Sequence, residues 1–214
     1  MESEQDFGFL TDQDIQHQSD HLFKEGYNPN EAKRAAYDLH LGEYAYLTGS
    51  DYPQKLSEKQ PFISIPRGQF ALLITKEYVT MPKDYLGLIS TKFGFKEQGL
   101  INVSGFHVDP GFHGKILFSV FNAGPMDVVL EYDKPTFMLF FYKLHKEVGN
   151  PYNGERQGQT HLPTNIVTSL KGSSASLSDV DKRVSQLETT TKVYWAVLIA
   201  LIGALVAVFL KYAM

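Results

Sequence analysis

The residues best suited to chemistry lie in two stretches of the sequence. Asp109 begins an Asp-Pro-Gly run and has a histidine on each side, His107 and His113. Asp-Pro-Gly also favours a tight turn, so a reactive carboxylate and a purely structural turn both remain open. Arg156, Gln157 and Gln159 lie in a polar, glycine-rich segment of the kind that closes over phosphates, although an ordinary linker has the same composition. These two stretches are the candidate parts of a site.

The composition excludes several classes of site. The chain contains no cysteine among its 214 residues. This excludes disulfide bonds, thiolate zinc or iron–sulfur sites, a cysteine nucleophile and the zinc deaminase signature, which needs a Pro-Cys-x-x-Cys element. We interpret the histidines, including His107 and His113, as structural residues or as neighbours of a candidate ligand rather than as metal ligands, and we expect no zinc site. The net charge of −4 argues against binding of DNA or RNA.

The sequence pattern around these residues indicates mainly β-strands. Short apolar runs separated by proline and glycine follow Tyr37, at residues 62–65, 69–74, 85–89, 115–121, 127–130 and 136–142. Runs of this length with turn residues between them predict an all-β sandwich or barrel. Helical signals are confined to residues 7–35, where Thr11 and Asp14 have the spacing of a capping box and residues 29–36 read as a second helical turn.

Residues 193–210 form a run of 18 residues without a charge. As a helix with a rise of ~1.5 Å per residue the run would be roughly 27 Å long, enough for a thin hydrocarbon core. Trp195 and Tyr212 suit the two headgroup regions. The sequence therefore predicts a single-pass, C-terminal anchor in a lipid bilayer; a buried core helix is the alternative. Residues 1–6 have neither a basic start nor an apolar stretch, so we expect no signal peptide and a cytoplasmic main domain.

Two further parts precede this run. Residues 163–176 are rich in Thr, Asn, Ser and Gly, which predicts a flexible linker. In residues 177–192 a 3-4-3-4 spacing places five residues on one seam of a helix: Leu177, Val180, Val184, Leu187 and Thr191. A short coiled-coil-like stalk and a solvated connector explain this spacing equally well. The predicted order is a domain over 1–162, a linker over 163–176, a stalk over 177–192 and a transmembrane helix over 193–210.

Six motifs follow one another along the β-rich region: Leu10-Thr-Asp-Gln-Asp-Ile15, Tyr37-Asp-Leu-His-Leu-Gly42, Phe70 to Pro82, Gly87-Leu-Ile-Ser-Thr91, Val108-Asp-Pro-Gly-Phe-His-Gly114 and Tyr152 to Thr160. Their order resembles that of the dCTP deaminase family, which shares its fold with dUTPases. Each motif alone is weakly specific, but their order and spacing are shared. The resemblance implies a dUTPase-like, dCTP deaminase-like β-barrel with short N-terminal helices.

The resemblance also implies a ligand and a mechanism. It implies a homotrimer with nucleotide sites between subunits, in which a carboxylate activates water to deaminate dCTP without zinc, and Mg²⁺ accompanies the triphosphate. Asp109 matches the aspartate that contacts the deoxyribose and, in dUTPases, helps to orient water. Ser104 and His107 belong to the loop whose backbone reads the pyrimidine edge, and Gly111 follows in the same motif. The implied phosphate-covering residues are Tyr152, Arg156 and Gln159.

Two positions depart from the family pattern. Ser119 stands ten residues after Asp109, where the family has its catalytic glutamate, and a serine hydroxyl is not a general base near neutral pH. In the phosphate loop, Gly94 occupies the position of the family's arginine. Lys92 or Lys96 can supply a cation as a point charge, although both also read as solvated surface lysines. The substrate-binding residues expected in this loop are Ser90, Thr91, Lys92 and Lys96.

Three functions are compatible with these residues. The first is a membrane-tethered nucleotide deaminase or hydrolase, and the second is a non-catalytic nucleotide sensor that couples its pocket to the membrane segment. The third is a scaffold with an empty pocket. Because the general base is missing, we expect binding of a pyrimidine deoxynucleotide with weak or absent deamination.

Overall fold

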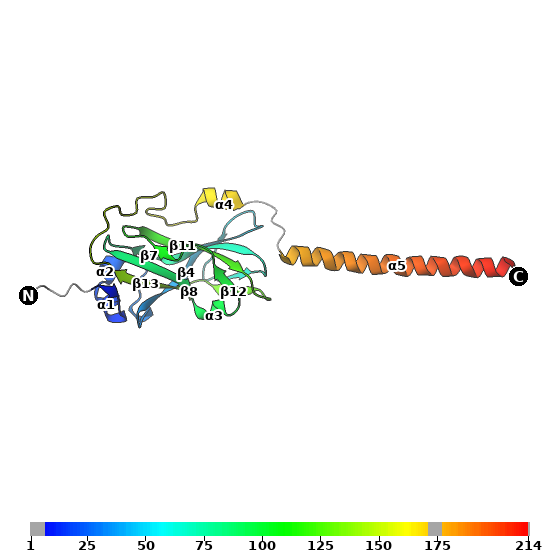
Figure 1. Ribbon diagram of the computed structural model, residues 1–214, viewed down its shortest axis with the longest axis horizontal. Helices are drawn as coiled ribbons and strands as arrows, with labels where there is room; N and C mark the ends of the chain where they lie inside the picture. Colours follow the sequence, from blue (N-terminus) through cyan, green and yellow to red (C-terminus); the bar gives the residue numbers. More distant parts are fainter. Residues whose placement is uncertain (1–6, 171–176, 214) are drawn as a thin grey trace, which may run out of the picture. The chain divides into compact units, whose positions relative to one another are not determined.

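The structure is a computed structural model that describes residues 7–170 and 177–213. The chain divides between residues 174 and 175 into two compact units. The first unit contains the β-rich region and the second contains one long helix (Figure 1). Each unit is described by itself below.

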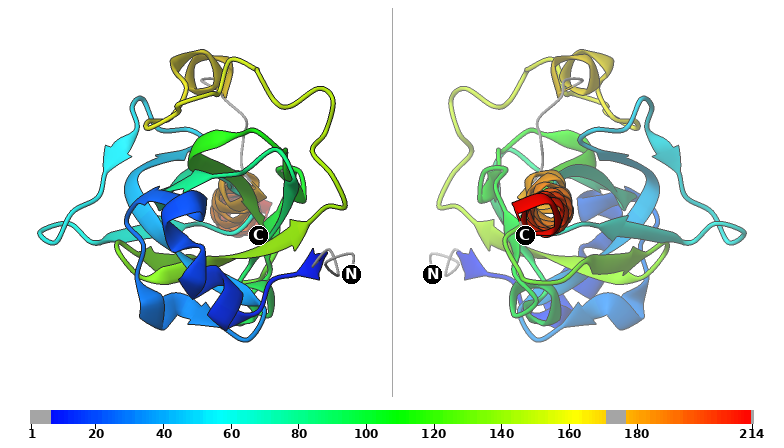
Figure 2. Two further views of the ribbon diagram at one scale, coloured as in Figure 1. Left: turned by 90° about the vertical axis from the view of Figure 1, so that its left-hand side faces the viewer. Right: turned by 90° about the vertical axis from the view of Figure 1, so that its right-hand side faces the viewer.

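The first unit is built on one large antiparallel sheet that curls around a core (Figure 2). In spatial order its strands are β10 (His107–Val108), β8 (Tyr85–Thr91), β13 (Pro135–Lys143), β4 (Ala36–Leu47), β7 (Phe70–Thr80), β11 (His113–Asn122) and β9 (Leu100–Asn102). Short strands extend it, namely β1 (Gly8–Phe9) beside β13, β2 (Phe23–Glu25) beside β7, and β3 (Ala32–Lys33) and β5 (Gln54–Lys55) beside β4. A separate pair joins β12 (Val128–Glu131) to β6 (Phe62–Ile65). The predicted mainly β fold is confirmed.

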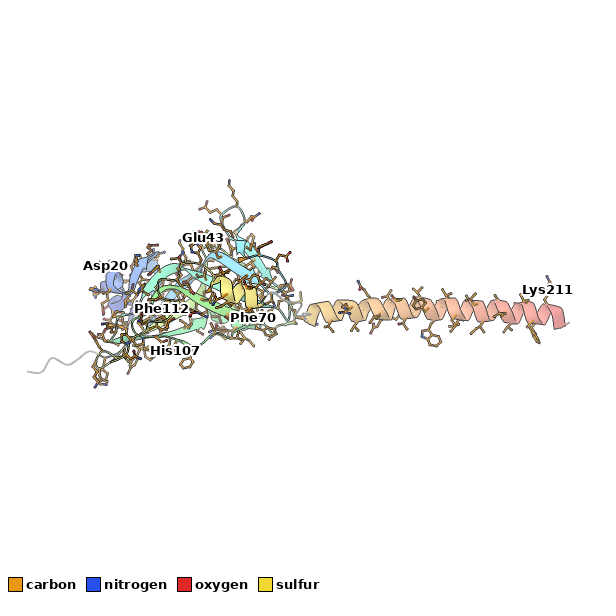
Figure 3. All side chains as sticks on the ribbon, turned by 90° about the horizontal axis from the view of Figure 1, so that it is seen from above. Asp20, Glu43, Phe70, His107, Phe112 and Lys211 are labelled. Atoms are coloured by element: carbon orange, nitrogen blue, oxygen red, sulfur yellow. The ribbon has the colours of Figure 1, made fainter. Side chains whose placement is uncertain are left out.

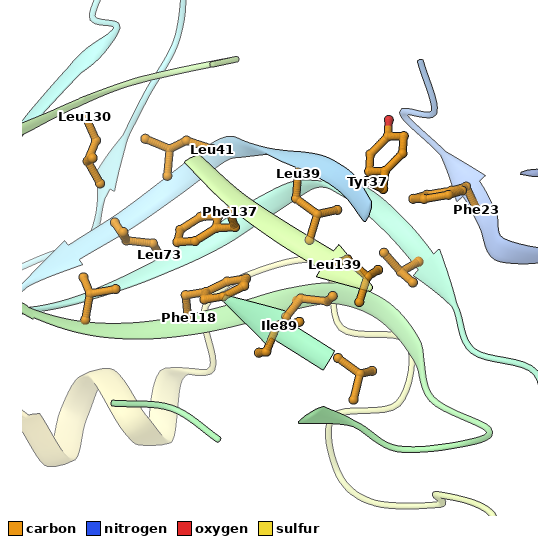
Figure 4. Packing of buried hydrophobic residues seen from close by; sticks show 14 of the residues in the cluster. Phe23, Tyr37, Leu39, Leu41, Leu73, Ile89, Phe118, Leu130, Phe137 and Leu139 are labelled. Atoms are coloured by element: carbon orange, nitrogen blue, oxygen red, sulfur yellow. The ribbon is translucent and has the colours of Figure 1, made fainter. Parts of the chain in front are cut away.

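The core lies inside the curl of this sheet (Figure 4). Along β8 buried residues alternate with partly exposed ones, as expected for a strand with one face toward the core. Phe118 of β11 and Phe137 of β13 stack at the centre, with ring centroids 3.8 Å apart and an interplanar angle of 11°. Ile89 of β8 belongs to the same cluster, so the core reaches the strand that leads to the candidate site.

The N-terminal helices are short. α1 (Asp12–His17) starts with the predicted capping box, in which the Asp14 N–H donates to Thr11 Oγ1 at 3.3 Å and the Thr11 N–H donates to the Asp14 carboxylate at 2.9 Å. α2 (Ser19–Leu22) follows. The expected second helical turn over 29–36 is wrong beyond η1 (Pro29–Glu31), because Ala32 and Lys33 pair with β4 as strand β3.

A buried ionisable pair crosses from β4 to β7. The Glu77 side chain is fully buried, and both its oxygens accept from the His40 backbone N–H, at 3.0 and 3.1 Å. Nδ1 of His40 lies 2.6 Å from Oε1 of Glu77. Burial raises the pKa of Glu77 above its ordinary value of 4.5, while the contacts with His40 lower it. Because burial is the larger effect, the folded state favours the protonated acid.

This pair predicts a pH dependence of stability. The stabilisation from protonated Glu77 is fully present below pH 4.5, the ordinary pKa, and is lost as the pH rises through the higher folded pKa. We therefore expect the unfolding free energy of wild type, relative to Glu77→Gln, to fall as the pH rises above 4.5. Urea unfolding of residues 1–174 at several pH values measures it. Glu43→Gln, at a half-exposed carboxylate, is the matched control; a constant difference for Glu77→Gln would contradict the assignment.

The predicted flexible linker over 163–176 is wrong in its first half, where α4 (Thr164–Leu170) forms. Val167 of α4 is buried, and with Leu162 it joins a second apolar cluster on β4, β7 and β11. The members contributed by these strands are Tyr46, Leu72, Ile74 and Leu117. The helix therefore covers the face of the sheet opposite the core. Residues 171–176 lie outside the described part of the chain.

The second unit contains α5 (Leu177–Ala213), a helix of 37 residues. The expected stalk over 177–192 and the expected transmembrane helix over 193–210 are parts of this one continuous helix. Within the described residues α5 is the one helix long and apolar enough to cross a membrane, over Arg183–Lys211, where an 18-residue stretch reaches a mean hydropathy of 2.7. Its apolar side chains, including Trp195 and Phe209, are exposed.

Candidate functional site

The candidate site is a cavity of about 290 Å³ in the first unit. This volume is near the lower end of the range for small-molecule sites. Three chain segments form most of it: the loop from Ser104 to Phe112, the middle of β11, and the segment from Tyr152 to Gln159; Ile89 of β8 completes the lining. The lining residues are Ile89, Ser104, Gly105, His107, Val108, Asp109, Phe112, Ile116, Leu117, Tyr152, Arg156 and Gln159. The cavity thus brings together both stretches that the sequence singles out.

One wall of the cavity is apolar. Ile89, Phe112 and Ile116 are buried members of the main core, so the core fixes their positions. Phe112 packs edge-to-face against Tyr152, with ring centroids 5.7 Å apart. Figure 3 labels Phe112 and His107, which both belong to the loop from Ser104 to Phe112. An apolar wall with an aromatic pair offers a surface for a planar ring.

The polar side of the cavity carries Asp109. β10 pairs with β8, placing His107 opposite Leu88 and Val108 opposite Gly87. Asp109 follows directly, and its Oδ1 lies 3.3 Å from Nε2 of His107. The Asp109 side chain is 51% exposed, so it remains accessible to a ligand. Its carbonyl accepts from the Phe112 N–H at 3.1 Å, which closes a turn. Asp109 thus forms a turn and also lines the cavity, a position that is compatible with both interpretations of Asp-Pro-Gly.

Gly111 holds this turn in a conformation that other residues rarely adopt. Its φ is +88°, and a Cβ added there would lie 2.7 Å from Cβ of Pro151. We expect Gly111→Ala to destabilise residues 1–174 by about 1–3 kcal/mol and to weaken ligand binding, because the turn carries Asp109. Chemical denaturation and ligand titration measure the two effects. Gly105→Ala, at an open position of the same loop, should be well tolerated; equal stability of the two variants would contradict the argument.

A small hydrogen-bond network fixes the loop at Ser104. Oδ1 of Asn102 accepts from Ser104 Oγ at 2.6 Å and from the Ser104 N–H at 3.2 Å. The Asn102 side-chain amide donates to the Gly105 carbonyl at 3.2 Å. Sequence reasoning missed Asn102, although asparagine two residues before a Ser-Gly pair is typical of such turns. Asn102 positions the loop and does not itself line the cavity.

The segment 152–159 is tied to the Asp109 loop and β11. The Tyr152 N–H donates to the Pro110 carbonyl at 2.8 Å, and the Lys115 N–H donates to the Gln159 carbonyl at 2.7 Å. Gln157 makes two bonds, since its Oε1 accepts from the His113 N–H at 3.1 Å and its Nε2 donates to the Gly111 carbonyl at 2.7 Å. Gln157 does not line the cavity itself, but these bonds position the neighbouring Arg156 beside it.

The side-chain amide of Gln159 makes only part of its possible hydrogen bonds. Its Nε2 donates to the Lys115 carbonyl at 3.0 Å, while its buried Oε1 has no hydrogen-bond partner among the described residues. Gln159 and Arg156 also line a neighbouring hollow of about 620 Å³ formed by residues 152–166. These two polar side chains therefore face both spaces, as expected for residues that meet a ligand extending from one to the other.

The four residues expected in the phosphate loop do not line the cavity. Ser90 lies on β8 opposite Met138, and the buried Thr91 has no partner for its hydroxyl among the described residues. Lys92 Nζ lies 2.5 Å from the Asp38 carboxylate, which is 9% exposed. Lys96 is exposed at the end of α3 (Phe93–Lys96). The Asp38 carboxylate therefore already compensates the charge of Lys92, whereas Lys96 faces solvent.

Ser119 lies close to the cavity. Its carbonyl accepts from the Val103 N–H at 2.8 Å and from the Ser104 N–H at 3.2 Å. Because alternate residues of a strand share a face, Ser119 is on the same face of β11 as Leu117, which lines the cavity. A longer acidic side chain at this position would thus extend along the cavity wall. Among the described residues no group of three or more His, Asp or Glu side chains is arranged to hold a metal.

Comparison with known proteins identifies the family. The sequence profile of a family described as dCTP deaminase-like matches residues 9–144. The dCTP deaminase of Thermococcus sibiricus is 31% identical over 138 residues, covering 64% of this chain and 86% of the relative. The dCTP deaminase of Thermococcus kodakarensis is 32% identical over the same shares. The chain belongs to the dCTP deaminase-like family, which confirms the resemblance.

A solved structure supports the same fold. The 2'-deoxycytidine 5'-triphosphate deaminase of Agrobacterium tumefaciens matches with a TM-score of 0.55 at 16% identity, over 65% of this chain. The match spans 49% of that enzyme. The family profile ends at residue 144, before the segment 152–159.

Proposed function

We propose that the first unit binds a pyrimidine deoxynucleoside triphosphate in the cavity beside Asp109. The observation that carries this proposal is the meeting of three chain segments that are distant in sequence, which places Ser104, His107 and Asp109 in one space with Arg156 and Gln159. Membership of a family whose relatives are dCTP deaminases supports the ligand class.

Each part of the cavity has a role in this proposal. The aromatic wall at Phe112 packs against the pyrimidine ring, and the backbone of the 104–107 loop reads its edge. Asp109 accepts a hydrogen bond from the deoxyribose hydroxyl, as an ionised acceptor does strongly. Arg156 and Gln159 contact the phosphates across the neighbouring hollow.

Mg²⁺ enters this proposal together with the triphosphate. Asp109 is the one acid among the residues that line the described cavity, and Glu155 lines the neighbouring hollow. Such a donor set suits a Mg²⁺ ion that keeps most of its ligands from phosphates and water. The bound ion would neutralise phosphate charge, and the side chains of this chain would orient the nucleotide.

The phosphate-loop residues act in this proposal through a homotrimer. Ser90, Thr91, Lys92 and Lys96 do not line the cavity of their own chain. In the proposed trimer they contact the nucleotide held by a neighbouring subunit, with the exposed Lys96 as the principal cation. Lys92 attracts the phosphates less strongly, because its ion pair with Asp38 offsets its charge.

The proposed activity is binding without deamination by the glutamate mechanism. Ser119 cannot take a proton from water near neutral pH. The protein is therefore a nucleotide sensor whose membrane helix distinguishes it from an enzyme for a diffusible substrate. Thermal denaturation of the chain with dCTP, dUTP or dATP plus Mg²⁺ tests the ligand class; stabilisation by the two pyrimidine nucleotides supports it, and equal stabilisation by dATP contradicts it.

In the same proposal, α5 anchors the protein in a bilayer with the first unit on the cytoplasmic side. The exposed apolar surface over Arg183–Lys211 supports this anchoring, because water solvates such a surface poorly. We expect the full chain to resist alkaline extraction from membranes, and residues 1–174 to appear in the soluble fraction. Asp109→Ala in the full chain is the control and should remain with the membranes. Recovery of the full chain in the soluble fraction would contradict the anchor.

A further inference from the structure

The first half of α5 carries an apolar stripe that no described part of the chain covers. Val180, Val184 and Leu187 are 43%, 47% and 66% exposed, and with Thr191 they follow a 4-3-4 spacing of the kind found in coiled coils, 180-184-187-191. These residues lie on one face of the helix. The apolar surface on that face is therefore available to another helix.

Charged residues flank this stripe on both sides. Arg183 precedes Val184, which is the position called g in a heptad, and Glu188 follows Leu187, which is the position called e. In a parallel, in-register pair of helices, a residue at g faces the residue at e five positions later in the partner. Residue 183 would then face residue 188, and the two charges are opposite. An antiparallel pair would instead bring g beside g and e beside e, which places like charges together.

From this charge pattern we propose that α5 packs, parallel and in register, against α5 of a second copy of this chain along Val180, Val184, Leu187 and Thr191. Arg183 then pairs with Glu188 of the partner subunit. The proposal goes beyond nucleotide binding; it agrees with the proposed membrane anchor, because anchors inserted in one direction leave neighbouring stalks parallel. About two heptads are marginally stable alone, and the anchored, trimeric first unit raises their effective concentration.

The stripe also continues into the apolar part of the helix. The same spacing leads from Thr191 to Tyr194, Leu198 and Leu201. Every neighbouring position there is apolar as well, so the direction and register of the pair are set by the charged half of α5. Packing of this kind would join the copies along α5, from its charged first half into its apolar second half.

The absence of cysteine from the chain makes the packing directly measurable. Single substitutions Val184→Cys and Leu187→Cys introduce thiols on the stripe, and Ser185→Cys and Thr189→Cys introduce them on other faces of the same turns. Each full-length variant is oxidised in isolated membranes and separated without reducing agent. We expect disulfide-linked dimers at 184 and 187 in several-fold higher yield than at 185 and 189. Equal yields at the four positions, or no dimer at 184 and 187, would overturn the proposal.

The charge pair gives a second, independent test. In the Leu187→Cys background, Arg183→Glu and Glu188→Arg should each lower the dimer yield, because each brings like charges together. The double exchange should restore the yield. An unchanged yield in both single variants would overturn the parallel register. These residues are outside the cavity, so nucleotide titration of the same variants separates a failure of this packing from a failure of nucleotide binding.

Discussion

Ser119→Glu is expected to create dCTP deamination in a chain that otherwise has none above background. Position 119 shares a face of β11 with Leu117, which lines the cavity, so a carboxylate there extends along the cavity wall. A positioned general base accelerates such a proton transfer by roughly 10²–10⁴-fold. The expected gain is therefore large compared with the effect of any other substitution considered for this protein.

Ammonia release from dCTP in the presence of Mg²⁺ measures the gain. Ser119→Gln has nearly the same size and no basic carboxylate, and it should stay inactive. Robust ammonia release by wild type would contradict the assignment of a non-deaminating pocket. Activity in the Gln variant equal to that of the Glu variant would show that the residue acts through packing rather than as a base.

Asp109→Ala is expected to weaken binding of the nucleotide by at least about tenfold, which corresponds to ~1.4 kcal/mol. The substitution removes an ionised acceptor from the cavity, and hydrogen bonds to charged groups contribute about 1.5–3 kcal/mol. The turn itself survives in this variant, because the Phe112 N–H donates to the backbone carbonyl of residue 109.

Calorimetric titration of residues 1–174 with dCTP measures this loss of affinity. Asp20→Ala makes the same chemical change in α2, outside the cavity, and should leave the affinity unchanged. An unfolding midpoint close to that of wild type separates loss of a contact from loss of the fold. Unchanged affinity of the Asp109 variant would remove Asp109 from the site.

The sequence allowed most strands to be predicted, and the exceptions have physical causes. β4 carries Asp38 and His40 among its buried residues, so its pattern of polar and apolar residues does not read as one long strand. The partner of His40 is Glu77, 37 residues away, and only the folded chain brings the two together. Gly42 adds an irregularity, because a Cβ there would lie 2.5 Å from the Thr75 carbonyl oxygen.

α4 was missed for a similar reason. Its seven residues carry weak helical signals and much of their composition is typical of a linker. Burial of Val167 against the outer face of the sheet is a tertiary contact, which outweighs weak local propensity. Such a contact has no signature in the local sequence.

The site was predictable in part. The order of motifs indicates that Asp109 and Arg156 belong to one site, and the structure places both on one cavity. The ion pair between Lys92 and Asp38 could not be predicted from the sequence, because Asp38 lies 54 residues earlier. The positioning role of Gln157 could not be predicted, because it depends on backbone groups of His113 and Gly111, which the sequence does not bring together.

The most direct test of the central claim is a titration of the purified full-length chain, in detergent with Mg²⁺, with dCTP and with dUTP, combined with assays of ammonia and pyrophosphate on the same samples. Saturable binding of a pyrimidine deoxynucleotide at micromolar concentration, without ammonia release, is the result that we predict. Absence of binding for both nucleotides would contradict the claim, and so would rapid deamination of dCTP by the wild-type chain.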